Sequence, residues 1–305
     1  MTIAEQHAAA RQSTFWPAFA ALLGGAMAMG ISPIFVRLSD VGPFASAFYR
    51  VFLALPVLYG WMRMEEARAG THDSGPAFSA PMIATGIFFA ADLFVWHLAI
   101  AKTTVANATF FATTAPVWVV VFGWLVYRRK ASPSSIAGLA LCLAGGMVLI
   151  GQSFALAPEH LVGDGFAETT AVFFGAYFLC VEKARLIYRA ARVTFYMSIV
   201  TSLVLAVAAL WATAWLGQPF LPSGPVGWLT LFALAWISHV GGQGLLTVAL
   251  GSLPVTFSSL VIFLEALAAA ALAWLILGEA ITLAQALGGL VIVAGIWIAR
   301  PRERK

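Results

Sequence analysis

Three ionisable side chains, Glu265, Asp92 and His239, lie near the middle of long apolar runs of the sequence. A charged group at such a depth costs about 3 kcal/mol when the run inserts into a membrane, so it usually faces a cavity or a partner. A carboxyl group can bind an ammonium group or a proton, and an imidazole can exchange a proton near neutral pH. These residues are therefore the first candidates for binding chemistry.

Other candidates share a helical face with these residues. Phe88, Asp92 and Trp96 are spaced four residues apart, which places them on one face of a helix. Gln243 follows His239 by one helical turn. Aromatic walls with a few polar anchors suit a solute that is apolar at one end and polar at the other. Further aromatic residues that could line such a site are Phe110, Trp118, Phe173 and Tyr177.

Each candidate also has a purely structural interpretation. Glu265 could be a neutral or ion-paired carboxyl that holds helices together, and Arg50 is the partner that best matches its depth. His239 could simply donate to a backbone carbonyl. Most aromatic residues must pack or face lipid. Three prolines interrupt apolar runs and could be gating hinges or static kinks, namely Pro33, Pro56 and Pro116.

The composition indicates that these residues are held by membrane-spanning helices. Of 305 residues, 61% are hydrophobic and 10% charged, whereas about a quarter are charged in soluble domains. A span needs about 20 mostly apolar residues, and the runs are too uniformly apolar for barrel strands, which alternate. We therefore predict an all-α polytopic membrane protein with ten transmembrane helices, at about 15–37, 44–62, 81–101, 104–127, 133–153, 166–186, 194–217, 226–249, 254–277 and 282–299.

The basic residues predict the orientation of these spans. If the N-terminus is cytoplasmic, fourteen of the 17 Lys and Arg residues fall in cytoplasmic segments, whereas Arg37 and Lys102 fall on the other side and Arg50 lies within a span. Cytoplasmic loops are enriched in Lys and Arg, so both termini are expected in the cytoplasm. The isoelectric point near 9.3 then reflects topology, and no nucleic-acid partner is expected.

An internal repeat divides the chain. Residues 104–146 align without a gap on residues 254–296, with identities at Val105/Val255, Trp124/Trp274, Leu125/Leu275, Gly138/Gly288, Ala144/Ala294 and Gly145/Gly295. Five spans per half is an odd number, so the second half must be inverted, an arrangement typical of secondary transporters. The predicted organisation is a tail at 1–14, a first repeat at 15–153, a loop at 154–165, a second repeat at 166–299 and a tail at 300–305.

The segment "LEALAAAALAWLILGEAITLAQALGGLVIVAGIWI" resembles the second-half signature of the EamA-type ten-helix transporters in the drug/metabolite transporter superfamily. The matching positions are Leu264, Glu265, Gly278, Glu279, Gln285, Gly288 and Gly295. Ala266 departs, because the family usually has proline there, and Arg129 stands where the first half usually has a glutamate. Within the superfamily the chain is most similar to bacterial aromatic amino-acid exporters, and the resemblance implies efflux across the inner membrane.

The expected function is therefore a secondary transporter that exports small amphipathic metabolites, aromatic or other amino acids first, by alternating access. An exporter of another metabolite or drug class is the alternative. An intramembrane enzyme is disfavoured by the absence of a His-Glu-x-x-His motif and of a nucleophile elbow, and a channel by the absence of a filter or charged ring. No cofactor or metal is expected, and the protein is expected to work as a monomer.

Overall fold

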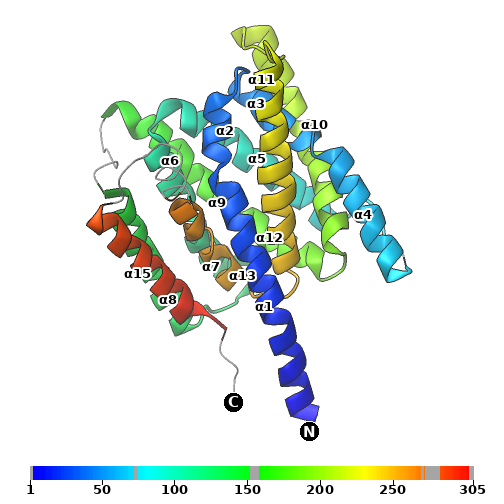
Figure 1. The fold of residues 1–305 in the computed structure, drawn as a ribbon, viewed down its shortest axis with the longest axis vertical. Coiled ribbons are helices and arrows are strands. Elements are labelled where there is room, and N and C mark those ends of the chain that lie inside the picture. Colours follow the sequence, from blue (N-terminus) through cyan, green and yellow to red (C-terminus); the bar gives the residue numbers. More distant parts are fainter. Residues whose placement is uncertain (1–2, 72–74, 152–157, 269–270, 272–281, 302–305) are drawn as a thin grey trace.

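The structure is a computed structural model that describes residues 3–71, 75–151, 158–268, 271 and 282–301. Helices are the only regular secondary structure in these residues, and loops connect them (Figure 1). The predicted all-α class is confirmed for these residues. The helices are α1 (Ile3–Gly30), α2 (Ser32–Leu38), α3 (Pro43–Phe52), α4 (Leu55–Ala69), α5 (Ala80–Lys102), α6 (Val105–Ala112), α7 (Ala115–Tyr127), α8 (Pro133–Ile150), η2 (Pro158–His160), α9 (Leu161–Arg185), α10 (Ala190–Leu216), α11 (Pro225–Ala233), the π-helix η3 (Leu234–Gln243), α12 (Gly244–Ala249), α13 (Val255–Leu260) and α15 (Leu283–Ala299).

Seven helices in the described residues are long and apolar enough to cross a membrane, namely Phe15–Leu38, Pro43–Ala69, Ala80–Lys102, Ala106–Tyr127, Pro133–Ile150, Ala190–Leu216 and Pro225–Ala249. α9 has 25 residues, but its acidic and basic side chains lower its hydropathy. Val255–Ala268 and Leu283–Ala299 are shorter apolar helices. The molecule is thus a multi-pass membrane protein.

The three prolines stand where helical segments begin. Pro33, Pro56 and Pro116 occupy the first turns of α2, α4 and α7, and each follows a break in an otherwise continuous span. A proline lacks the backbone N–H of a helix interior but is tolerated in the first turn, so the breaks are local to these residues. The sequence had located these interruptions correctly.

Some helices extend beyond the predicted spans. α1 begins at Ile3, because the Ala-rich segment before Phe15 favours helix, although its membrane-spanning part begins at Phe15 as predicted. α9 begins at Leu161, inside the predicted loop at 154–165. The repeat positions Trp274, Leu275, Gly278 and Glu279 lie outside the described residues.

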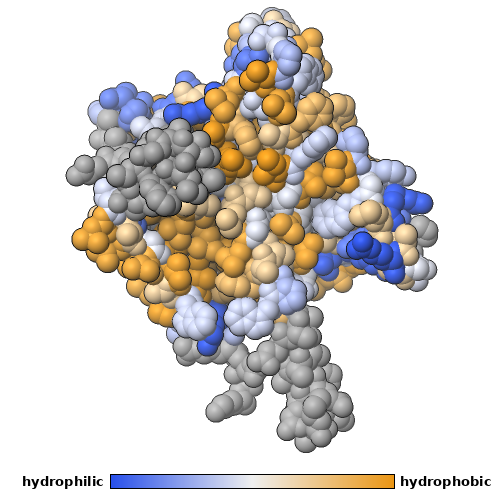
Figure 2. All heavy atoms as spheres, viewed as in Figure 1, coloured by the Kyte–Doolittle hydropathy of each residue, from blue (hydrophilic) through white to orange (hydrophobic). Residues whose placement is uncertain are grey.

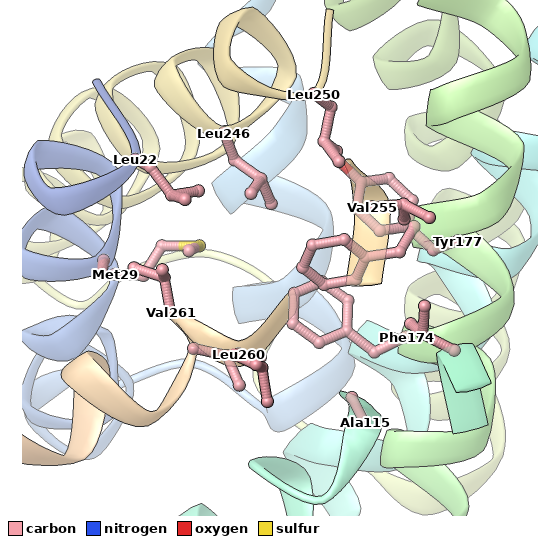
Figure 3. Packing of buried hydrophobic residues seen from close by; sticks show 14 of the residues in the cluster. Leu22, Met29, Ala115, Phe174, Tyr177, Leu246, Leu250, Val255, Leu260 and Val261 are labelled. Carbon is pink, nitrogen blue, oxygen red and sulfur yellow. The ribbon is translucent and has the colours of Figure 1, made fainter. Parts of the chain in front are cut away.

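Buried aromatic and aliphatic side chains from α1, α9, α12 and α13 form the centre of the molecule (Figure 3). Phe174 and Tyr177 of α9 stack with ring centroids 5.5 Å apart. Their rings project towards Val255 and Leu260, while Leu22 and Met29 of α1 meet Leu246 on the other side. This packing joins helices from the beginning, middle and end of the chain.

α8 and α15 pack side by side through glycines (Figure 1). A methyl group at Gly138 would lie 2.5 Å from the carbonyl oxygen of Gly295, and one at Gly145 would lie 2.7 Å from that of Gly288. The contacts run in opposite order along the two helices, which are therefore antiparallel. The repeat offset of 150 relates Gly138 to Gly288 and Gly145 to Gly295, so each of the two contacts is the repeat counterpart of the other. The interface is therefore reciprocal, as at a two-fold axis.

The outward-facing sides of the helices carry many apolar residues. Hydrophobic residues cover much of the visible face, and hydrophilic residues gather towards its edges (Figure 2). Large exposed side chains on several helices, such as Met27, Trp124, Leu203 and Leu290, are of the kind that lipid covers. The start of α1 and the end of α15 lie at the same end of the molecule (Figure 1).

Candidate functional site

A cavity of about 60 Å³ lies where the helix breaks and the charged residues meet. Its lining comes from the α1–α2 break, from α3, α5, α6, α9 and η3, and from the segment that follows α13. Five of the predicted site residues that line it carry polar or aromatic groups, namely Arg50, Asp92, Trp96, Gln243 and Glu265. Pro33 lines it as well, beside Ser32. The cavity thus collects side chains from both halves of the chain.

Arg50 supplies a buried cation to this cavity. Its side chain is 4% exposed, and its guanidinium carbon lies 5.7 Å from the centroid of the Trp96 ring. Its Nε has no hydrogen-bond partner in the described residues, and no ion pair joins it to a described carboxyl group. A buried guanidinium normally satisfies its donors, so Arg50 can donate to an acceptor that enters the cavity.

Asp92 and Glu265 place two carboxyl groups in the same cavity. Asp92 is buried on α5, one turn before Trp96. Glu265 has a buried Oε1 that lacks a hydrogen-bond donor among the described residues. A carboxyl that served only to hold helices together would accept such a bond, so the geometry disfavours that interpretation of Glu265. Arg50 and Glu265 line the same cavity, but no ion pair or hydrogen bond joins them in the described residues.

Neutral polar groups complete the lining. The hydroxyls of Ser32 and Thr170 are buried without a hydrogen-bond partner within the described part of the chain. Gln243 is held in place, since its Oε1 accepts a hydrogen bond from the Tyr177 hydroxyl at 3.0 Å. Gln243 is the last residue of the π-helix η3, and π-helical turns occur often at functional sites.

His239 lies in η3 beside the cavity and does not line it. Its Nε2 is 2.8 Å from the Ser198 hydroxyl, its ring lies 5.5 Å from that of Phe89, and its Nδ1 has no partner in the described residues. Tyr177 likewise reaches the site only through Gln243. These two residues support the cavity from the layer behind it.

The remaining predicted residues lie elsewhere. Phe88 packs against the hydrophobic core, and Phe110 lies near Gly146. Trp118 turns towards α9, and Pro116 is buried in the first turn of α7. Phe173 is half-buried, and its neighbour Phe174 lines the cavity instead. Consecutive residues of a helix point about 100° apart. Because the run is uniformly hydrophobic, the sequence did not show which of the two phenylalanines faces the cavity.

The sequence also left two carboxyl groups of α9 unnoticed. Glu168 accepts hydrogen bonds from Trp118 Nε1 at 2.8 Å and from the Thr114 hydroxyl at 3.0 Å. One turn earlier, buried Asp164 accepts from Thr103 at 2.6 Å and from Asn107 at 2.9 Å. The spacing of four residues on α9 was the available signal. The bonds of Glu168 fasten α9 to the break between α6 and α7, and those of Asp164 fasten it to the junction of α5 and α6.

Comparison with known proteins follows this geometry. The model of the EamA-like transporter family matches residues 16–151 and again residues 161–300. Because the two matches cover most of the chain, the protein belongs to the EamA-like transporter family, within the drug/metabolite transporter superfamily.

Two curated relatives come from Archaeoglobus fulgidus, and both are described as uncharacterised transporters. One is 24% identical over 280 residues, covering 89% of this chain and 93% of the relative. The other is 25% identical over 283 residues, covering 92% and 95%. A solved crystal structure with 20% sequence identity covers 94% of this chain with a TM-score of 0.72, which shows the shared fold.

Proposed function

We propose that this transporter exports small amphipathic amino compounds, aromatic or other amino acids first, across a bacterial inner membrane. The observation that carries the proposal is a cavity with the guanidinium of Arg50, which forms no ion pair in the described residues, carboxyl groups at Asp92 and Glu265, and the ring of Trp96. A free amino acid would offer each group what it lacks. Its carboxylate suits Arg50, its ammonium group suits a carboxyl, and its side chain suits Trp96.

The size of the cavity supports alternating access. At about 60 Å³ it is several-fold smaller than typical ligand pockets of about 300–1,000 Å³. A substrate therefore requires the two halves to separate on one side of the site. The breaks at Ile31, Leu53–Ala54 and Thr113–Thr114 give the helices places to bend.

The proposed topology has ten spans in two inverted repeats, close to residues 15–153 and 166–299, with both termini in the cytoplasm. Support comes from the distribution of basic residues, from the reciprocal glycine contacts of α8 and α15, and from the two family matches. Each half contributes to the cavity, so we propose that one monomer is sufficient for transport.

The proposal is tested by counterflow. Proteoliposomes containing the purified full-length protein are loaded with one unlabelled amino acid and supplied outside with the labelled form. We expect saturable accumulation for aromatic or other apolar amino acids, and reduced accumulation when either the carboxylate or the ammonium group of the solute is blocked. Equal transport of solutes that lack both groups would favour the alternative, an exporter of another metabolite or drug class.

A further inference from the structure

An apolar groove of about 290 Å³ runs between α1, α13 and α15 at the end of the molecule where α1 begins and α15 ends. All of its lining residues but one are apolar, and Phe15 and Phe19 of α1 stack on each other against Phe257 of α13. Trp16 and Trp297, on its two sides, are 56% and 59% exposed. The groove therefore opens to the surface that lipid covers.

A second hollow, of about 430 Å³, adjoins this groove. Phe257 and Arg300 line both spaces, so the two lie next to each other. We call the second hollow the basic cavity, because Arg129, Lys130 and Arg300 line it together with a single carboxyl, Glu182. Hydroxyl-bearing residues also line it, namely Ser132, Ser134, Ser135 and Thr256.

The charges of the basic cavity are not balanced. Arg129 donates to Glu182 Oε2 at 2.6 Å, so this pair is neutral as a unit. Lys130 and Arg300 form no ion pair with a carboxyl group in the described part of the chain. The Arg300 guanidinium lies over the Trp297 ring, with its carbon 3.9 Å from the centroid, which holds the charge at the junction of groove and cavity.

We propose that the groove and the basic cavity together bind one anionic phospholipid, with an acyl chain along the groove and the phosphate beside Arg300 and Lys130. A soluble anion would use the basic cavity but leave the apolar groove uncovered. A zwitterionic lipid would carry its own cation towards Lys130 and Arg300, which form no ion pair in the described part of the chain. An anionic lipid matches both spaces, since its acyl chain is apolar and its phosphate is negatively charged. Tryptophans are enriched at the membrane–water interface, where the head group of a lipid lies.

The site also touches the helix that carries Glu265. Phe257 precedes the break at Val261–Ile262, and Leu264 follows it, immediately before Glu265. An acyl chain in the groove would pack against both sides of this break. The lipid would therefore hold the two helical pieces in their relative positions. The binding proposal rests on the groove and the cavity alone, independently of the transported solute.

The test uses purified, delipidated full-length protein and native mass spectrometry, with titration of dioleoyl phosphatidylglycerol, dioleoyl phosphatidylcholine or soluble glycerol 3-phosphate. We expect one tight phosphatidylglycerol site on the wild type and weaker binding of the other two. Lys130→Gln or Arg300→Gln should weaken it about fivefold, and the double variant about 30-fold, the fold-changes that correspond to about 1 kcal/mol per basic residue. Trp16→Ala, which opens the groove, should weaken lipid binding as well.

Arg68→Gln is the matched control, since Arg68 is an exposed basic residue at the end of α4 that lines neither space. It should bind phosphatidylglycerol as the wild type does. Equal wild-type affinity for the two lipids would overturn the proposal without any variant. Full phosphatidylglycerol affinity in the folded double variant would also overturn it. Glycerol 3-phosphate binding as tightly as the lipid would show a soluble-anion site and overturn the lipid assignment.

Discussion

The central cavity brings together charged side chains with buried polar atoms that have no hydrogen-bond partner in the described residues. Arg50 and Glu265 keep buried polar atoms free of hydrogen bonds within the described residues, whereas Asp164 and Glu168 each accept two or more. The sequence identified Arg50, Asp92 and Glu265 because a charge inside an apolar run stands out in any fold. Ser32, Thr170 and Phe174 could not be found in this way, since hydroxyls and aromatic rings occur along most of the runs.

Trp96→Ala removes the ring that faces Arg50 in the cavity. Transport efficiency for aromatic solutes should fall about 5- to 30-fold, as expected for the loss of about 1–2 kcal/mol of stacking and cation–π contact. Concentration-dependent uptake into proteoliposomes measures this. Trp211→Ala is the control, because Trp211 is 53% exposed on the outer side of α10. Unchanged kinetics in well-folded Trp96→Ala would place the solute elsewhere.

Interrupted helices are the main feature at the scale of elements. Prolines in the sequence predicted the breaks before α2, α4 and α7, because each proline removes a helical hydrogen bond. The break at Val261–Ile262 and the π-helix η3 have no such marker.

Glu168 should stabilise the break between α6 and α7. Glu168→Ala leaves Trp118 Nε1 and the Thr114 hydroxyl without this acceptor, so we expect a loss of about 1–3 kcal/mol of stability. Glu168→Gln retains an acceptor and should lose less. Thermal unfolding in detergent measures the difference. Thr169→Ala is the control on the exposed side of α9, and an equal effect of all three changes would contradict this role.

Two loops meet at the end of the molecule opposite the start of α1, through Asp40 and Ser223. The Ser223 hydroxyl and backbone N–H donate to Asp40, which lowers the pKa of this carboxyl below its ordinary value of 3.8. The contact is therefore present above that value and weakens as the pH falls through the lowered pKa. Hydrogen exchange at Ser223 should show protection that is lost in acid.

In Asp40→Asn the same amide should exchange faster at neutral pH and lose the acid dependence, because the side chain no longer titrates. Ser39→Ala serves as a control for general loosening of the neighbouring loop, since Ser39 bonds only locally to Val41. Protection of Ser223 that stays constant down to strongly acidic pH in the wild type would contradict the assignment of the contact to Asp40.

At the scale of the whole molecule, we propose an organisation in two matching halves. The offset of 150 that aligns the sequence also exchanges the contacts of Gly138 and Gly145 with those of Gly295 and Gly288. The sequence predicted the halves from the gap-free alignment at this offset, and its glycines lie where α8 and α15 approach closely. It could not predict how the halves enclose the cavity, because that depends on contacts between distant segments.

Both termini are expected in the cytoplasm. A reporter that is active only in the periplasm should therefore be silent when fused after Lys305, and active when inserted between Ser39 and Gly42. The basic residues supply the physical reason, because they disfavour translocation of the loops that carry them. The opposite pattern of reporter activity would reverse the proposed orientation.

Glu265→Gln gives the most direct test of the proposed site, because this variant keeps the shape of the side chain and removes its charge. We expect the variant to insert and fold but to accumulate amino acid poorly in counterflow, or to lose the dependence of transport on pH. Wild-type accumulation at every pH, by folded Glu265→Gln in the same proteoliposomes, would contradict a role of this charge in transport and make Glu265 a packing residue.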